Sequence, residues 1–266
     1  MLKFKKVWGI YFSPTLTTRK LVNAIVDGTG IEEKDYYDFT KPKMRQSFPE
    51  IEEGDLVVFG MPTYAGRLPN TIVKYFDKVK GNGAYAAAVV TFGNRAFDNS
   101  LIELKTKLEE AGFTVISGAA FATEHSFSYE INEGRPDFDD LDEAIEYGLK
   151  LTEIENVNEN LNIPGDKDAL YFKPHEKSED NMKFLKVKPK TNDKCTFCMS
   201  CARNCPMGAI NPENPTDIMG ICIKCNACVK RCNVQAKYFD DPIYLKHKTD
   251  LEEKYSEEEK ENQFFF

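Results

Sequence analysis

Eight cysteines lie between residues 195 and 232, and they form two copies of one spacing, Cys-x2-Cys-x2-Cys-x3-Cys. The first three thiols of a run lie on one tight loop and can bind three corners of an iron–sulfur cube. The fourth is beyond the reach of that loop and binds the other cube. The spacing therefore predicts two [4Fe–4S] clusters, the first held by Cys195, Cys198, Cys201 and Cys232 and the second by Cys222, Cys225, Cys228 and Cys205.

Two other uses of cysteine fit this pattern poorly. A zinc ribbon also contains paired Cys-x2-Cys units, but it leaves the third and fourth cysteines of each run without a role. A disulfide framework implies export, and the apolar residues 7–12 that follow the basic N-terminus are too few for a signal peptide. Because metal-bound thiolates persist in a reducing compartment, we expect a cytoplasmic protein.

Length and charge limit the partners of the chain. Its 266 residues predict about two domains, and no apolar run approaches the ~20 residues of a membrane span. The formal charge of −8 argues against nucleic acid. We expect redox partner proteins, no membrane, and leave a homodimer open. Residues 190–240 hold seven Lys/Arg against four Asp/Glu, and a solvated surface position is the simplest interpretation of any single lysine.

The first part of the chain alternates strand and helix patterns. Apolar runs predict strands over residues 4–12, 55–60, 84–92 and 113–122, with a weaker one over 35–39. Helical spacing covers residues 15–28, 71–80, 100–111 and 138–158. This alternation predicts an α/β domain with a doubly wound, five-stranded parallel sheet.

The composition divides the chain into four segments. They are an α/β domain over residues 1–159, a Pro- and Lys-rich linker over 160–189, the cysteine module over 190–240, and an acidic tail over 241–266. The module is too small for a large core and is expected to be a small α+β unit held by its metals. Residues 250–261 are interpreted as a solvated helix or as disorder. The three terminal phenylalanines are interpreted as a docking plug or a frayed end, with the frayed end preferred.

Three loops follow strands of the α/β domain, where such sheets bind ligands. Residues 13–18 (Ser-Pro-Thr-Leu-Thr-Thr) open a helix, so their hydroxyls and the free helix N–H groups predict a phosphate cradle. Helix capping alone is the competing interpretation. In residues 61–69 a Gly- and Pro-shaped loop can present Tyr64 to a planar ring, and the turn at 93–98 can bond the polar edge of that ring.

These loops resemble the phosphate loop and the two isoalloxazine loops of flavodoxins. Up to about residue 240, the chain resembles the flavodoxin–ferredoxin fusion proteins of anaerobic bacteria and archaea, an iron–sulfur flavoprotein family. The resemblance implies a flavodoxin-like domain, a two-cluster ferredoxin domain and bound FMN. It implies phosphate contacts from Ser13, Thr15, Thr17 and Thr18, stacking by Tyr64, ring contacts from Gly93, Asn94 and Arg95, and further site residues Pro62, Thr63, Ala65, Gly66 and Thr91.

The phosphate loop departs from the flavodoxin pattern at one position. That pattern is (Ser/Thr)-x-Thr-Gly-x-Thr, and Leu16 stands where it has glycine. If this position needs a positive φ, leucine costs on the order of 1 kcal/mol.

The leading hypothesis is electron transfer between FMN and two low-potential clusters, which links one-electron carriers to a redox partner. The first alternative is a flavin-dependent reductase of a small organic substrate fed by its own ferredoxin domain, with His125 or Tyr64 as proton donor. The second is a flavin-free docking domain that carries a ferredoxin, marked by Leu16.

Overall fold

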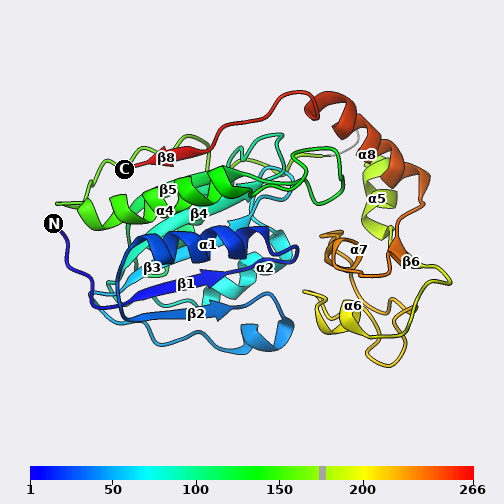
Figure 1. Cartoon of the computed structure of the whole chain (residues 1–266), viewed down its shortest axis with the longest axis horizontal. Helices are drawn as coiled ribbons and strands as arrows, with labels where there is room; N and C mark the ends of the chain where they lie inside the picture. The colour runs from blue at the N-terminus through cyan, green and yellow to red at the C-terminus, as the bar shows by residue number, and fades with distance from the viewer. Residues whose placement is uncertain (174–177) are drawn as a thin grey trace.

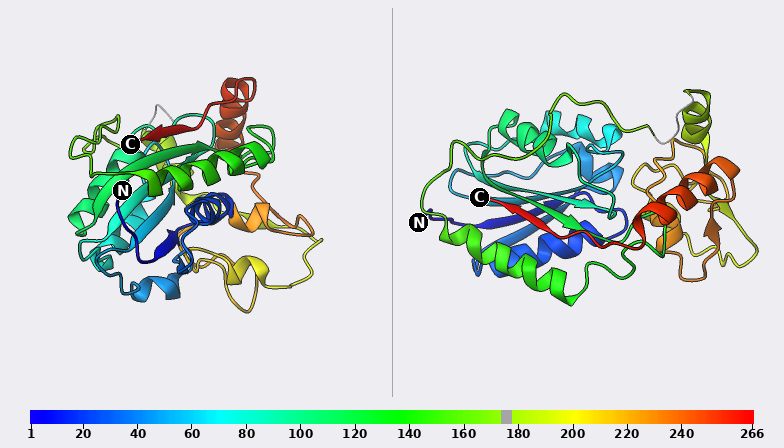
Figure 2. Two further views of the ribbon diagram at one scale, coloured as in Figure 1. Left: turned by 60° about the vertical axis from the view of Figure 1, so that its left-hand side comes forward. Right: turned by 90° about the horizontal axis from the view of Figure 1, so that it is seen from above.

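A computed structural model describes residues 1–173 and 178–266 (Figures 1 and 2). An α/β domain forms one side of the molecule, and the cysteine module lies beyond the tips of its strand arrows (Figure 1). In these two stretches no helix is long and apolar enough to cross a membrane.

Five parallel strands form the sheet, in the order β2-β1-β3-β4-β5. Because β2 and β3 lie on opposite sides of β1, the chain reverses direction across the sheet between β1 and β3, and the loops after these strands diverge there. This order is that of flavodoxin-like sheets, so the predicted fold class is confirmed. The strands are β1 (Val7–Tyr11), β2 (Lys34–Asp38), β3 (Leu56–Pro62), β4 (Tyr85–Phe92) and β5 (Thr114–Ala122).

Helices cover both faces of this sheet. One face packs against α1 (Thr17–Gly28) and α4 (Phe138–Glu153). The other packs against α2 (Asn70–Val73), the 3-10 helix η2 (Lys74–Lys78) and α3 (Ser100–Glu110). The central strand β3 is buried from both sides, which explains its uninterrupted apolar run. A short 3-10 helix, η1 (Pro42–Gln46), follows β2.

A sixth strand, β8 (Gln263–Phe265), pairs antiparallel with β5. The expected count of five is therefore one too low, and the expected frayed end is wrong. Phe264 stacks on Tyr147 with ring centroids 5.3 Å apart and meets Phe121 edge-on at 5.5 Å. Phe265 contributes to the core on the opposite face. The strand covers an apolar sheet edge that β5 would otherwise expose to solvent.

The linker and the tail contain helices that pack on each other. Helix α5 (Ser178–Lys186) lies in the expected linker, and α8 (Pro242–Tyr255) in the expected tail. Phe184 of α5 stacks on Tyr244 of α8 with centroids 6.3 Å apart, and Phe127 of the α/β domain joins them. The linker therefore has structure of its own. Residues 174–177 of that expected linker lie outside the described residues.

The cysteine module is a small α+β unit. Two short helices, α6 (Ser200–Arg203) and α7 (Ala227–Lys230), each contain the third cysteine of a run. The two-residue strands β6 (Lys190–Thr191) and β7 (Lys237–Tyr238) pair antiparallel beside them. The chain enters this module through α5 and leaves it through α8, and then returns to the sheet as β8 (Figure 2).

Leu16 has a left-handed backbone, with φ 75° and ψ −2°, and helix α1 begins directly after it. A side chain at this φ is strained because Cβ crowds the following carbonyl. The position where the flavodoxin pattern has glycine thus adopts a conformation that favours glycine, although a leucine occupies it.

Phe264→Ala should destabilise the α/β domain by about 2 kcal/mol, because it removes the ring that packs on Tyr147 and Phe121. Thermal unfolding of the purified protein should show a Tm lower by roughly 5 °C. Phe266→Ala is the comparison variant, since Phe266 also contacts Tyr147, with ring centroids 5.5 Å apart, but is 43% exposed and should cost less stability. Equal losses in the two variants would contradict the role assigned to β8.

Leu16→Gly should raise the free energy of unfolding by about 1 kcal/mol, because glycine adopts the left-handed conformation without strain. Leu16→Ala keeps Cβ and therefore the strain, and it should show no such gain. Thermal unfolding of both variants beside the wild type measures the difference. A gain in the alanine variant equal to that in the glycine variant would exclude backbone strain as its cause.

Candidate functional site

The loop after β1 offers several donors to an anion. The Ser13 Oγ accepts a hydrogen bond from the Arg19 N–H at 3.0 Å, so this serine caps helix α1. The Thr18 and Thr91 hydroxyls lie 2.8 Å apart and are buried. The N–H groups of Thr17 and Thr18 have no acceptor among the residues described. The cap thus accounts for one hydroxyl. The Thr15 and Thr17 hydroxyls lie 3.4 Å from each other, and together with these N–H groups they can donate to a phosphate.

The loop after β3 is a tight turn. Tyr64 and Arg67 exchange two backbone hydrogen bonds, of 2.8 and 3.1 Å, across a left-handed pair, Ala65 (φ 51°) and Gly66 (φ 78°). The Thr63 hydroxyl lies 2.7 Å from the Ser100 Oγ. Pro62 ends β3 and leads into this turn. The turn therefore holds the Tyr64 ring at the carboxyl end of the sheet.

A segment of the expected linker packs against this turn. The Arg67 guanidinium donates to the Glu103 carboxylate at 2.9 Å and to the Lys167 carbonyl at 2.9 Å. The Phe172 N–H donates to the Ala65 carbonyl at 2.8 Å. These bonds hold the turn rigid from its outer side.

In the loop after β4, glycine is required at position 93. A Cβ on Gly93 would lie 2.3 Å from Cδ2 of His125, so the imidazole packs directly on this glycine. The His125 Nδ1 accepts a hydrogen bond from the Phe127 N–H at 3.1 Å. Burial, with the nearby positive charges, lowers the pKa of His125 to about 3. The imidazole is therefore neutral and supports the loop, and its ability to donate a proton to a substrate stays a hypothesis.

The side chains of Asn94 and Arg95 in this loop already have partners within the chain. The Asn94 amide donates to the Tyr255 and Glu258 carbonyls, both at 2.7 Å, and its Oδ1 accepts from the Lys260 N–H at 2.8 Å. Arg95 forms an ion pair with Asp98. For a flavin ring, Asn94 thus has its backbone carbonyl left to offer, because its side chain binds the C-terminal segment and its N–H donates to the Phe92 carbonyl at 3.1 Å.

The two cysteine runs share one backbone conformation. The residues on either side of the second cysteine are left-handed in both runs, with φ of 54° and 58° at Phe197 and Met199 and of 54° and 56° at Lys224 and Asn226. The fourth cysteine accepts a backbone hydrogen bond in each run, 3.3 Å from the Ala209 N–H to Cys205 and 3.2 Å from the Ala236 N–H to Cys232. Such bonds stabilise cluster sulfurs.

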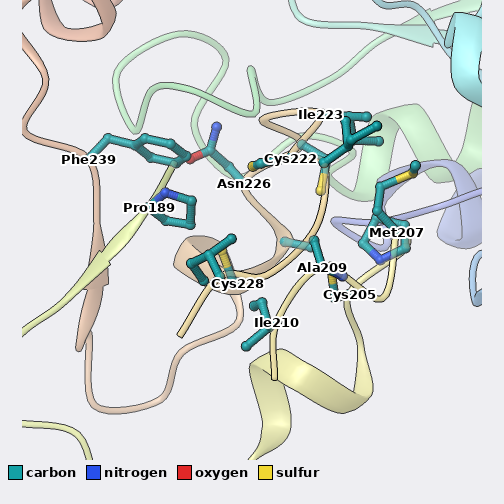
Figure 3. Close-up of a pocket in the computed structure, with 15 residues that line it drawn as sticks. Pro189, Cys205, Met207, Ala209, Ile210, Cys222, Ile223, Asn226, Cys228 and Phe239 are labelled. Carbon is teal, nitrogen blue, oxygen red and sulfur yellow. The ribbon is translucent and has the colours of Figure 1, made fainter. Parts of the chain in front are cut away.

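A small cavity brings together cysteines of both runs (Figure 3). Apart from Asn226, its other lining residues are apolar, among them Met207, Ile210 and Ile223. Burial raises the pKa of Cys225 to about 12, so a thiolate there needs a positive partner such as iron. The cysteines that line it are Cys205, Cys222, Cys225 and Cys228, which are the four ligands predicted for the second cluster.

This donor set fits a cubane. Among the described residues, no three His, Cys, Asp or Glu side chains converge on one ion-sized point. A cubane does not need such convergence, because each thiolate binds a separate corner. Of the four cysteines predicted for the first cluster, Cys198 is exposed and Cys195, Cys201 and Cys232 are half-buried.

Two lysines of the module are buried, which corrects the expectation of solvated lysines. The Lys237 ammonium donates to the Thr191 hydroxyl at 2.7 Å and to the Pro215 carbonyl, and Lys224 donates to the Leu185 carbonyl at 3.0 Å. Each of these acceptors is neutral. A negative partner stabilises a buried ammonium, and the predicted clusters would supply one.

The cysteine module docks on the α/β domain at the carboxyl ends of its strands. Met207 and Ile223, which flank the cavity, pack against the core beneath η2 and α3. The Arg45 guanidinium donates to the Pro206 carbonyl. On the other side of the module, Lys230 of α7 forms an ion pair with Glu124 and donates to the Ser128 carbonyl. The loops of the second cysteine run therefore face the carboxyl ends of the strands.

Tyr64 lies at this contact. Burial raises the pKa of its phenol well above the usual value, and the nearby Cys225 and Cys222 thiols raise it further. The residue predicted to stack on a flavin thus also lies beside the cavity predicted to hold the second cluster. No sequence signal identifies the docking residues Arg45, Met207 and Glu124, because their partners lie more than 100 residues away.

Comparisons with known proteins concern both the α/β domain and the cysteine module. The family described as "4Fe-4S binding domain" matches residues 189–211, which include the first cysteine run. A flavodoxin from the domain Archaea aligns with 19% identity and a TM-score of 0.40 over 56% of this chain and 96% of its own.

Two larger solved structures also align with the α/β domain. One is rubredoxin oxygen:oxidoreductase from Desulfovibrio gigas, with 13% sequence identity and a TM-score of 0.40. The other is the flavodiiron protein from Giardia intestinalis, with 16% sequence identity and a TM-score of 0.37. Each alignment covers 57% of this chain and 36% of the other protein, so this chain spans about a third of their length. A search of curated proteins found no match. By strand order and by the matched segment, the chain joins a flavodoxin-like domain to a ferredoxin-type 4Fe-4S segment.

Proposed function

We propose that this protein carries electrons between FMN and two [4Fe–4S] clusters and so links one-electron carriers to a redox partner. The observation that carries the proposal is that Met207 and Ile223, which line the cavity predicted for the second cluster, pack against the α/β domain. Electron transfer needs donor and acceptor groups to lie close together, and this contact brings the two candidate cofactor sites to one interface.

The donors of the α/β domain suit FMN. The N–H groups at the start of α1 and the Thr15 and Thr17 hydroxyls would bind its phosphate, and Tyr64 would lie against its ring. Such a flavin supplies one- or two-electron chemistry, whereas each cluster passes single electrons. The backbone of the second cysteine run repeats that of the first, which supports a second cluster.

Burial gives the two clusters an order along the route. Cys198 and its neighbour Phe197 are exposed, which makes the first cluster the one that an external protein can approach. Cys225 is buried, and the loops around the second cluster face the sheet. We infer that electrons pass between a partner and the first cluster, then the second cluster, then FMN beside Tyr64. Two successive single-electron passages supply the two electrons of a complete flavin cycle.

Anaerobic reconstitution should yield about eight irons, about eight sulfides and one FMN per chain. Colorimetric iron and sulfide assays, with flavin release by acid, measure this content. About four irons would contradict the second cluster. Absence of FMN with full iron content would favour the flavin-free docking domain.

Cys205→Ser should interrupt the route between the clusters and FMN, because Cys205 lies in the second cluster's cavity. With a photoreduced small ferredoxin as donor, the first cluster should be reduced, but flavin bleaching should be at least tenfold slower than in wild type. Stopped-flow absorption follows the flavin, and freeze-quench EPR follows the clusters.

Cys198→Ser is the matched variant at the exposed cluster. Here the remaining cluster and the flavin should both stay oxidised on the timescale of wild-type reduction. Flavin reduction at the wild-type rate in either variant would show that the proposed order is wrong.

A further inference from the structure

The two cysteine runs differ at the residue before the fourth cysteine. The first run has Asn204 at this position and the second has Arg231. The Asn204 amide bonds within its own run, to the Ser200 carbonyl at 2.9 Å. A neutral residue with local contacts is therefore sufficient for the fold of a cysteine run, and Arg231 needs another explanation.

Arg231 extends out of its module to the phosphate loop. Its Nη1 donates to the Pro14 carbonyl, at 3.4 Å, in the loop between β1 and α1. A guanidinium carries five N–H donors, and this bond uses one of them. The other donors lie beside the loop that contains the unbonded N–H groups of Thr17 and Thr18.

No carboxylate neutralises this arginine directly. In the stretches 1–173 and 178–266, Arg231 forms no ion pair, whereas the neighbouring Lys230 pairs with Glu124. Half-burial lowers the pKa of Arg231, the more distant Asp38 opposes this effect, and the cationic Arg19 adds to it. Two guanidinium groups thus lie near one loop, an arrangement that an anion in the loop would stabilise.

We propose that Arg231 binds the FMN phosphate across the domain interface, as a ligand supplied by the cysteine module. This inference rests on the proposed function, since it presupposes FMN in the α/β domain. A guanidinium matches a phosphate through two parallel N–H···O bonds, which the neutral loop donors do not replace. Phosphate binding then stabilises docking of the module, and docking of the module completes the phosphate site.

The test compares two flavins that differ by the phosphate. FMN and riboflavin are titrated into flavin-depleted, iron-loaded protein, and quenching of flavin fluorescence gives both dissociation constants. The variant is R231N, because asparagine occupies this position in the first run and is compatible with its fold. The matched control is R203N, which removes the same charge from an exposed site in the module.

R231N should weaken FMN binding about tenfold or more and leave riboflavin binding and iron content unchanged. Unchanged FMN binding in R231N would overturn the role of Arg231 but leave the proposed function intact. Equal weakening of both flavins, or the same loss in R203N, would also overturn it, since the arginine would then act through docking or general charge. Failure of the wild type to bind either flavin would instead refute the flavin half of the proposed function.

Discussion

The arrangement of the molecule depends on how the cysteine module is held against the carboxyl ends of the parallel strands. Apolar contacts of Met207 and Ile223 and polar contacts of Arg45 and Lys230 fix it from two sides. The chain reinforces these contacts, because it enters the module from a segment bonded to the turn at Ala65 and leaves it towards strand β8. A module tethered at both ends loses little further freedom when it docks, so modest contacts are sufficient to keep it in place.

This arrangement changes the surroundings of the loops at the strand ends. In an isolated flavodoxin-like domain such loops meet solvent. Here Pro14, Tyr64 and Glu124 each contact or adjoin the module. The candidate site is therefore shared between the α/β domain and the cysteine module, and a structural change in either one affects the other.

Local sequence patterns were sufficient to predict most helices and strands. They could not predict contacts between residues that are distant in the sequence. The alternation of apolar runs and helical spacing was sufficient for the five parallel strands, and the cysteine spacing matches the set of four that surrounds the cavity. Strand β8 was not predicted because three phenylalanines are too short a pattern to indicate a strand. The strand forms because the edge of β5 is available for pairing. Lys237 was misjudged because its burial depends on acceptors at Thr191 and Pro215. The docking contacts pair residues that no local window contains.

Because β8 follows the cysteine module in the chain, its pairing with β5 would couple iron supply to the integrity of the sheet. The Ala122 N–H and the Asn262 amide oxygen, 2.9 Å apart in the fold, are separated by 140 residues of chain. Closing so long a loop costs conformational entropy, and the cost falls when the intervening segment is compact. Because metal binding folds small modules, an iron-starved chain leaves this loop longer and the β5 edge open more often. Iron limitation would then abolish electron transfer and would also promote aggregation and proteolysis of the whole chain.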